Sequence, residues 1–181
     1  MKKIIGIGLI LVILIVGGSF LINNLMKSTD GNNSQQSVEY SKNGISLSMP
    51  GDWVSADSQS NESILAIADP NSKDSSGFND INVNIEKKSD VRSLESEFNS
   101  NYNTLARNSD FNILFEGNAS FNGEPAMEAD YTSESGGDKK QHKAIWIQKD
   151  SDIYVILCSA PESKFEGELS TFDFIINSVK L

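Results

Sequence analysis

The sequence predicts an α+β domain in which a central, mostly antiparallel sheet lies between helices, with a transmembrane helix at the N-terminus. Three observations predict this class. Short segments of alternating apolar and polar side chains are joined by hairpin turns, as in antiparallel sheets. Two other segments repeat apolar residues every three or four positions, as amphipathic helices do. The first 25 residues contain a long apolar run without a charged side chain.

The N-terminal anchor is predicted from the apolar run at residues 4–22. As a helix this run would span about 28 Å, close to the hydrocarbon thickness of about 30 Å. Lys2 and Lys3 favour the cytoplasmic side, which places the rest of the chain outside the cell. The alternative is a cleaved signal peptide, whose apolar region is usually shorter, roughly 7–15 residues. Both interpretations predict an extracytoplasmic domain at the cell membrane.

Composition predicts the domain boundaries and argues against some classes of function. Residues 1–25 are the predicted anchor, 26–37 a flexible polar linker and 38–181 the globular domain. All 25 acidic residues follow Lys27, and the net charge of the chain is −10. This charge argues against binding to nucleic acid or anionic lipid, both of which need basic patches. A single cysteine also means that no internal disulfide can stabilise the fold.

Four strands are predicted before the first helix of the domain. Residues 38–40 and 45–49 flank a short hairpin turn, and the second of them alternates strictly, so one of its faces should be buried. A Pro-Gly turn then places Trp53 on the core, and strands at 64–68 and 81–85 follow.

Two helices are predicted from apolar stripes. The first covers residues 91–105, with Ser89 or Asp90 as its cap and acidic residues in its early turns. The second begins near Phe165 and carries its apolar stripe to Val179.

Between these helices the sequence predicts two long hairpins. Strands at 111–121 and 124–132 are joined by Asn-Gly, the strongest short hairpin signal. Strands at 143–149 and 153–160 are joined by Asp-Ser-Asp, and the second is apolar on both faces, as a central strand would be. A turn centred on Ser151 predicts that position 142 lies opposite 160 and position 158 opposite 144.

Three stretches in order resemble the PsbP family: residues 43–53 with their strand and Pro–Trp turn, the strand at 80–86, and the segment from Gly136 to the C-terminal helix. The resemblance covers about residues 38–180. It implies a PsbP-like α/β/α sandwich and a non-enzymatic, membrane-associated accessory role. Photosynthetic members are extrinsic subunits of photosystem II that help to retain calcium and chloride. This chain lacks their basic docking segment and transit peptide, so a photosystem role is not expected.

One candidate metal site involves the only histidine. The predicted hairpin brings His142 near Glu162, and the resembled family carries a histidine near this place. An imidazole and a carboxylate can contribute to a site for calcium, manganese or zinc. The alternative is a solvated histidine between Lys140 and Lys143, whose charges would repel a cation. We favour the solvated histidine.

A second cluster of possible ligands lies in one loop, at Asp69, Asn71, Asp74 and Asp80. Oxygen ligands at short steps suit calcium, but the order departs from that of an EF-hand loop. An ordinary polar turn is the interpretation we favour.

Catalytic motifs are missing from the sequence. No Gly-x-Ser-x-Gly elbow occurs, and Cys158 lies in the most apolar strand, which predicts a buried, inert thiol. Trp53 and Trp146 could line a ligand cleft, although we favour a place in the core. We therefore expect no enzyme and no cofactor apart from a divalent cation. The expected function is a membrane-anchored accessory domain that binds a partner protein or stabilises a membrane complex. The alternative is a small-ligand or divalent-cation-binding module.

Overall fold

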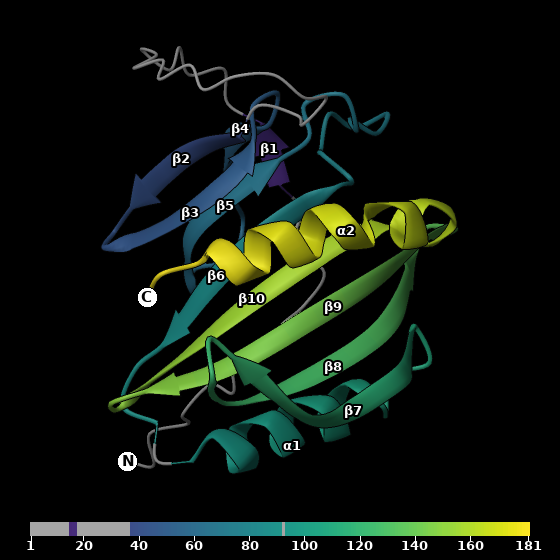
Figure 1. The fold of residues 1–181 in the computed structure, drawn as a ribbon. Coiled ribbons are helices and arrows are strands. Elements are labelled where there is room, and N and C mark those ends of the chain that lie inside the picture. The colour runs from purple at the N-terminus through teal and green to yellow at the C-terminus, as the bar shows by residue number, and fades with distance from the viewer. Residues whose placement is uncertain (1–14, 18–36, 92) are drawn as a thin grey trace, which may run out of the picture.

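A computed structural model describes residues 15–17, 37–91 and 93–181 (Figure 1). In chain order its elements are β1 (Ile15–Gly17), β2 (Ser37–Lys42), β3 (Ile45–Pro50), β4 (Val54–Ser58), β5 (Ser63–Ala68), β6 (Asn82–Lys88), α1 (Leu94–Leu105), β7 (Phe111–Phe121), β8 (Glu124–Ser135), β9 (Asp138–Lys149), β10 (Asp152–Pro161) and α2 (Glu162–Ser178). The large sheet has eight antiparallel strands in the order β1-β4-β5-β6-β10-β9-β8-β7, and β2 and β3 form a separate hairpin.

The two helices cover opposite faces of the large sheet, which confirms the predicted mostly antiparallel sheet with helices on it (Figure 1). On one side, called the α1 face, Phe98 and Tyr102 of α1 pack against the fully buried Trp146 of β9. On the other, called the α2 face, Phe172 of α2 packs with Ile156 of β10 in a second core. The β2–β3 hairpin shares this second core through the inward side of β3.

The Asn-Gly hairpin forms as predicted. Phe121 pairs directly with Glu124, so the turn consists of two residues, Asn122 and Gly123. Their φ angles are 51° and 86°, the left-handed conformation that a tight hairpin turn of this kind requires. Asparagine and glycine adopt this conformation most readily, which is why the local sequence was sufficient to place the turn.

The next hairpin differs from its prediction by one residue. Lys149 pairs with Asp152, so the turn contains only Asp150 and Ser151. Asp150 adopts a φ of 56°, which lets the chain reverse one residue earlier than a three-residue turn would. As a result His142 lies opposite Ser159 rather than Ala160, and position 158 lies opposite 143 rather than 144. The predicted pairing was therefore wrong by one position.

Helix α1 begins later than predicted. Its N-cap is Ser93, whose hydroxyl accepts a hydrogen bond from the backbone N–H of Ser96. Asp90, one of the two predicted caps, instead adopts a positive φ of 60° in the preceding turn. The backbone N–H of Val91 donates to the carbonyl of Ser151, so this stretch is held to the β9–β10 turn before the helix can start.

Two strands were not predicted. The polar sequence of β4 gives little alternation, yet β4 pairs with both β5 and β1. Residues 15–17 form β1 where the sequence predicted part of the anchor helix; isoleucine and valine are β-branched, and β4 offers a backbone edge. The remainder of the predicted anchor at 1–25, and of the linker apart from its last residue, lies outside the described residues. Within the described segments, no helix has the length and apolar character needed to cross a membrane.

Candidate functional site

The predicted metal ligand His142 is a buried residue of β9, only 1% exposed on the α1 face. Its Nε2 and the hydroxyl of Ser133 are 2.8 Å apart, and its Nδ1 and the hydroxyl of Ser159 are also 2.8 Å apart. The ring stacks on Tyr131 with centroids 4.6 Å apart. Burial, and to a lesser degree the charge of Lys140, lowers the pKa of His142 to about 3. The imidazole is therefore neutral near pH 7, with a hydrogen bond on each nitrogen.

The favoured interpretation of a solvated histidine is thus wrong. Adjacent residues of a strand point to opposite faces of the sheet. The ammonium group of Lys143 therefore lies on the α2 face, and the ring of His142 lies on the α1 face. On the α1 face, side chains of the two neighbouring strands enclose the imidazole. They are the hydroxyl of Ser159 on β10, and the hydroxyl of Ser133 and the ring of Tyr131 on β8.

Glu162, the other predicted ligand, is the first residue of α2. Its Oε1 lies 2.7 Å from Nζ of Lys139, and its side chain is 44% exposed. The two predicted ligands thus have different partners. Across the segments that the structure describes, no three or more histidine, cysteine, aspartate or glutamate side chains form a group suited to a metal ion. A metal on His142 would have to displace a serine hydroxyl, and the His142–Glu162 site stays a prediction.

The carboxylates of the loop before β6 are engaged in holding that loop. Asp69 Oδ1 accepts a hydrogen bond from the N–H of Asn71 at 2.8 Å, and Asp74 Oδ1 accepts two from backbone N–H groups of the loop. Asp80 Oδ1 lies 2.8 Å from Nζ of Lys140. These are the contacts of an ordinary polar turn, and a calcium site in this loop stays a prediction.

The residues considered for nucleophilic chemistry or a ligand cleft lie in the core. Cys158 has no exposed surface, and burial raises the pKa of its thiol, which confirms the predicted buried thiol. Trp146 is fully buried and donates its indole N–H to the Tyr102 hydroxyl at 3.0 Å. Trp53 is 6% exposed.

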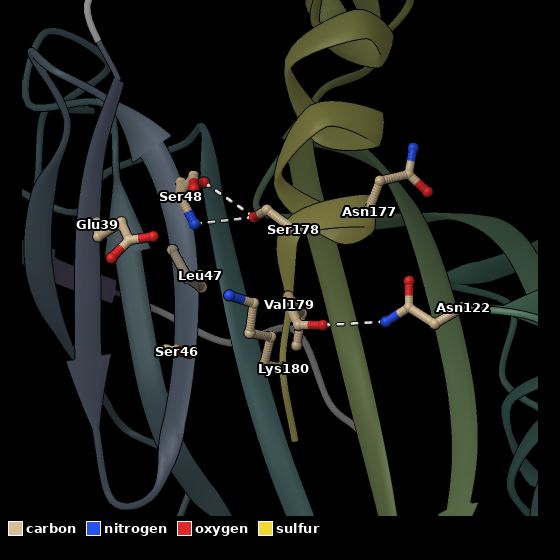
Figure 2. A pocket seen from close by; sticks show the side chains of 9 residues that line it. All are labelled: Glu39, Ser46, Leu47, Ser48, Asn122, Asn177, Ser178, Val179 and Lys180. Carbon is tan, nitrogen blue, oxygen red and sulfur yellow. Dashed lines mark hydrogen bonds between the residues drawn. The ribbon is translucent and has the colours of Figure 1, made fainter.

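A polar pocket of about 280 Å³ lies at the C-terminal end of α2, where the chain passes between β3 and the β7–β8 turn (Figure 2). Its lining residues are Glu39, Ser46, Leu47, Ser48, Asn122, Asn177, Ser178, Val179 and Lys180. Figure 2 shows Ser178 turned toward Ser48 and Asn122 turned toward Val179. The backbone N–H of Ser48 donates to the Ser178 hydroxyl at 2.8 Å, and the Asn122 amide donates to the Val179 carbonyl at 3.1 Å. The hydroxyls, amides and two opposite charges around this pocket suit a small polar molecule.

A different kind of surface lies at the far edge of the sheet, along β7. No other strand of the described chain pairs with the outer side of β7. Leu114 is 50% exposed and Phe115 is 48% exposed. Both lie at a β-bulge, where Leu114 is the extra residue between the pairs made by Ile113 and Phe115. The Phe115 ring lies over Gly117, so close that a Cβ at Gly117 would be 2.7 Å from Phe115 Cζ.

Behind this edge, on the α2 face, three carboxylates surround one ammonium group. Lys143 Nζ lies 3.4 Å from Glu128 Oε1 and 3.5 Å from Asp173 Oδ1, and Asp130 is the direct cross-strand neighbour of Lys143. Oδ1 of Asp130 is buried without a hydrogen-bond partner among the described residues. Burial, and then the charge of Glu128, raises the pKa of Asp130 to about 6. The group therefore carries surplus negative charge near pH 7.

The sequence predicted β7 as a strand but did not predict its exposed apolar surface. The signal lies in three consecutive apolar residues, Ile113, Leu114 and Phe115, which break the alternation of a regular strand. A bulge explains the break, because it turns an extra side chain outward. The position of β7 at the edge depends on the strand order, which hairpin signals do not give.

Comparisons with known proteins agree with this architecture. The family model described as PsbP-like protein matches residues 5–181. Cyanobacterial PsbP from Synechocystis is similar with a TM-score of 0.61 and 15% identity, over 86% of this chain and 98% of that one. LpqN of Mycobacterium tuberculosis, described as involved in cell envelope biogenesis, is similar with a TM-score of 0.56 and 14% identity, over 80% and 90% of the two chains. At these identities the two structures show a shared fold. A search of curated proteins found no match.

Proposed function

The chain belongs to the PsbP-like protein family, and from this premise we propose that it is a non-enzymatic accessory domain that binds a partner protein along β7. The proposal places the domain outside the cell membrane, held there by the N-terminal apolar segment; a helix through residues 15–17 would require β1 to separate from β4. Family membership supports the accessory character, and the geometry of β7 supports the place of binding.

One observation carries the proposal: β7 is a long edge strand with exposed apolar side chains. It has 11 residues, and the described chain provides no strand for its outer side. The backbone N–H and C=O groups of such an edge can pair with an extended segment of another protein. Leu114 and Phe115 add apolar surface at the middle of the same edge. Natural sheets usually protect long edges with charge, proline or a covering element, so an exposed apolar edge favours a binding surface.

The buried state of the reactive side chains supports the non-enzymatic part. A nucleophile or general base must reach its substrate. Cys158 has no exposed surface and a raised pKa, and both nitrogens of His142 bond to serines.

Photo-crosslinking in native membranes tests the place of binding. A photoreactive amino acid would replace Asn118, which is exposed on β7, in the full-length protein. The matched control places it at Glu166, which is exposed on α2. We expect one protein adduct from position 118 and none of the same size from position 166. Equal adducts at both positions, or none at 118, would contradict the proposal.

Alkaline carbonate extraction of the same membranes tests the anchor. A retained helix predicts that the protein stays in the membrane fraction with its N-terminal segment intact by mass spectrometry. Release of a shortened chain would instead identify a cleaved signal peptide.

The pocket at the end of α2 favours a second candidate function, the binding of a small polar ligand. Its volume of about 280 Å³ is near the lower end for ligand sites, roughly 300 Å³. The divalent-cation alternative is tested separately, by melting the protein with calcium, manganese or zinc. A rise in melting temperature that Glu162→Gln removes would support the His142–Glu162 site. An unchanged melting temperature with all three metals would eliminate it.

A further inference from the structure

We propose that the segment binding along β7 is basic, an extended stretch in which lysine or arginine alternates with apolar residues. This inference rests on the proposed function and specifies the chemistry of the partner at the same edge. It follows from three features: the register of the outer strands, the Phe115 ring over Gly117 and the charges on the α2 face.

The register determines which groups a new strand would meet. Directly opposite residues of antiparallel strands share a face, so Phe115 shares the α2 face with Asp130, and Gly117 shares it with Glu128. A strand added to β7 would continue these rows about 4.8 Å further out. Its side chains on this face would therefore lie beside Phe115 and Gly117, two strands from the carboxylates.

A long basic side chain suits this separation. The carboxylates of β8 are about 10 Å from the position of the added strand, twice the usual strand spacing, so only a long side chain can approach them. The Phe115 ring covers Gly117, so the way from the added strand to the carboxylates runs along this ring. The methylene groups of lysine or arginine could pack on that ring, and a cation within about 6 Å of an aromatic ring is favourable.

The charges on this face favour a cation in the partner. Among the described residues, Lys143 is the one cation paired with Glu128 and Asp173, Asp130 is its cross-strand neighbour, and Oδ1 of Asp130 is buried without a donor. An incoming ammonium or guanidinium group would supply the missing charge to this cluster through Glu128 and Asp173, whose side chains are 22% and 55% exposed. Protonation of Asp130, whose pKa is raised to about 6, should therefore weaken binding in mild acid.

The same charges disfavour a second copy of the chain as the occupant. Two β7 strands in contact would bring two sets of these carboxylates together, along with the exposed Glu116 of each copy. Like charges across an interface cost affinity. The partner is therefore expected to be a different protein with a basic segment.

Peptide binding to the full-length protein in detergent micelles tests the inference. The probe is a fluorescent peptide of about ten residues in which lysine alternates with valine or threonine, followed by anisotropy. The comparison peptide has glutamate in place of each lysine. We expect the lysine peptide to bind at least tenfold more tightly, and its affinity to fall with added salt. Equal affinities, or no binding by the lysine peptide, would overturn the inference.

Two further measurements identify the groups involved. The double variant E128Q/D130N should weaken the lysine peptide at least tenfold, whereas the control D52N/E166Q, with the same change in charge, should not. Thermal melts of both variants would check that they fold. N-methylation of alternate peptide amides blocks one edge of the peptide, so one of the two possible patterns should abolish binding. Unchanged binding by E128Q/D130N, or with both N-methylation patterns, would contradict the proposed mode.

The outcomes separate this inference from the proposed function. Crosslinks from position 118 to an acidic or uncharged segment would overturn the inference that the partner segment is basic. They would leave the proposal of partner binding along β7 intact. Concentration-dependent dimers in sedimentation velocity, abolished by L114D at the exposed apolar position of β7, would instead identify a second copy as the occupant and overturn the inference.

Discussion

His142 and Lys143 are neighbours in β9, yet they lie in opposite kinds of polar environment. His142 points to the α1 face, where two serine hydroxyls bond its two nitrogens and the ring is buried. Lys143 points to the α2 face, where three carboxylates share one ammonium group and one carboxylate oxygen has no donor in the described part of the chain. Successive residues of β9 thus place an imidazole with both nitrogens hydrogen-bonded on one face, and a cluster with an unpartnered carboxylate oxygen, among the described residues, on the other.

This contrast distinguishes structural polar groups from groups available for binding. A buried polar network stabilises a fold when every member has a partner, and it then has no capacity left for a ligand. An incomplete and partly exposed network costs stability, and a ligand can recover that cost by supplying the missing group. The sole histidine therefore belongs to the framework, whereas the carboxylates beside β7 belong to the proposed binding surface.

The largest expected effect is the loss of the histidine network. His142→Leu removes both hydrogen bonds and leaves the hydroxyls of Ser133 and Ser159 buried without their partner. We expect the free energy of unfolding to fall by about 3 kcal/mol, since each unsatisfied buried group costs about 1–3 kcal/mol. Urea denaturation at pH 7 measures this change. A loss below about 1 kcal/mol would mean that the network is not structural.

Lowering the pH should destabilise the fold through His142 as well. The unfolded histidine takes up a proton below about pH 6.5, whereas the folded one resists protonation down to about pH 3. The unfolded state therefore binds more protons in this window, and the free energy of unfolding should fall by up to about 1.4 kcal/mol per pH unit as the pH decreases. Denaturation of the wild type and His142→Gln between pH 7 and 4 isolates this contribution. Parallel curves would contradict it.

Asp130→Asn should have a smaller effect of the opposite sign. The folded carboxyl has a pKa raised to about 6 from 3.8, so the folded state pays to ionise it at pH 7. Removing the charge should stabilise the protein by about 1 kcal/mol at pH 7, after allowance for solvent screening of this half-exposed group. The gain should disappear near pH 4, where the carboxyl is protonated in the folded state of the wild type. A destabilised variant at pH 7 would show that the attraction of the Asp130 carboxylate to the charge of Lys143 dominates.

Gly117→Ala should change stability least and still alter the surface. The new methyl group would meet the end of the Phe115 ring, which can rotate away at a cost of about 0.5 kcal/mol. Binding of the lysine peptide should weaken about threefold, because the ring no longer lies beside the carboxylates. Gly167→Ala on α2, where nothing lies within 4 Å of the new methyl group, is the control. Equal affinities of the two variants would place the ring outside the binding surface.

Local signals in the sequence predicted most elements because each depends on a few neighbouring residues. Asn122 and Gly123 determine their hairpin through backbone conformation alone. The alternation around Val83 predicts β6, yet Asn82 and Asn84 are buried as well, because β6 is a central strand between β5 and β10. Centrality depends on strand order, and strand order depends on contacts distant in the sequence.

The candidate surfaces were harder to predict for the same reason. A shift of one residue in the β9–β10 turn changed the neighbour of His142 from alanine to Ser159, which completes the hydrogen bonds of the ring. The carboxylates gather around Lys143 only when β8, β9 and α2 come together. Spacing along the chain carries no record of either arrangement.

The residues at and after the end of α2, which line the polar pocket, also constrain the order in which this fold can form. Ser48 and Ser178 bond across 130 positions of the chain, and the backbone of Ser46 pairs with that of Lys180. The β2–β3 hairpin is thus synthesised well before its partners, because the groups that hold the inner edge of β3 are made more than a hundred residues later. Contacts of such long separation form slowly. A nascent chain would therefore keep the inner edge of β3 unpaired until α2 and the residues that follow it have been synthesised.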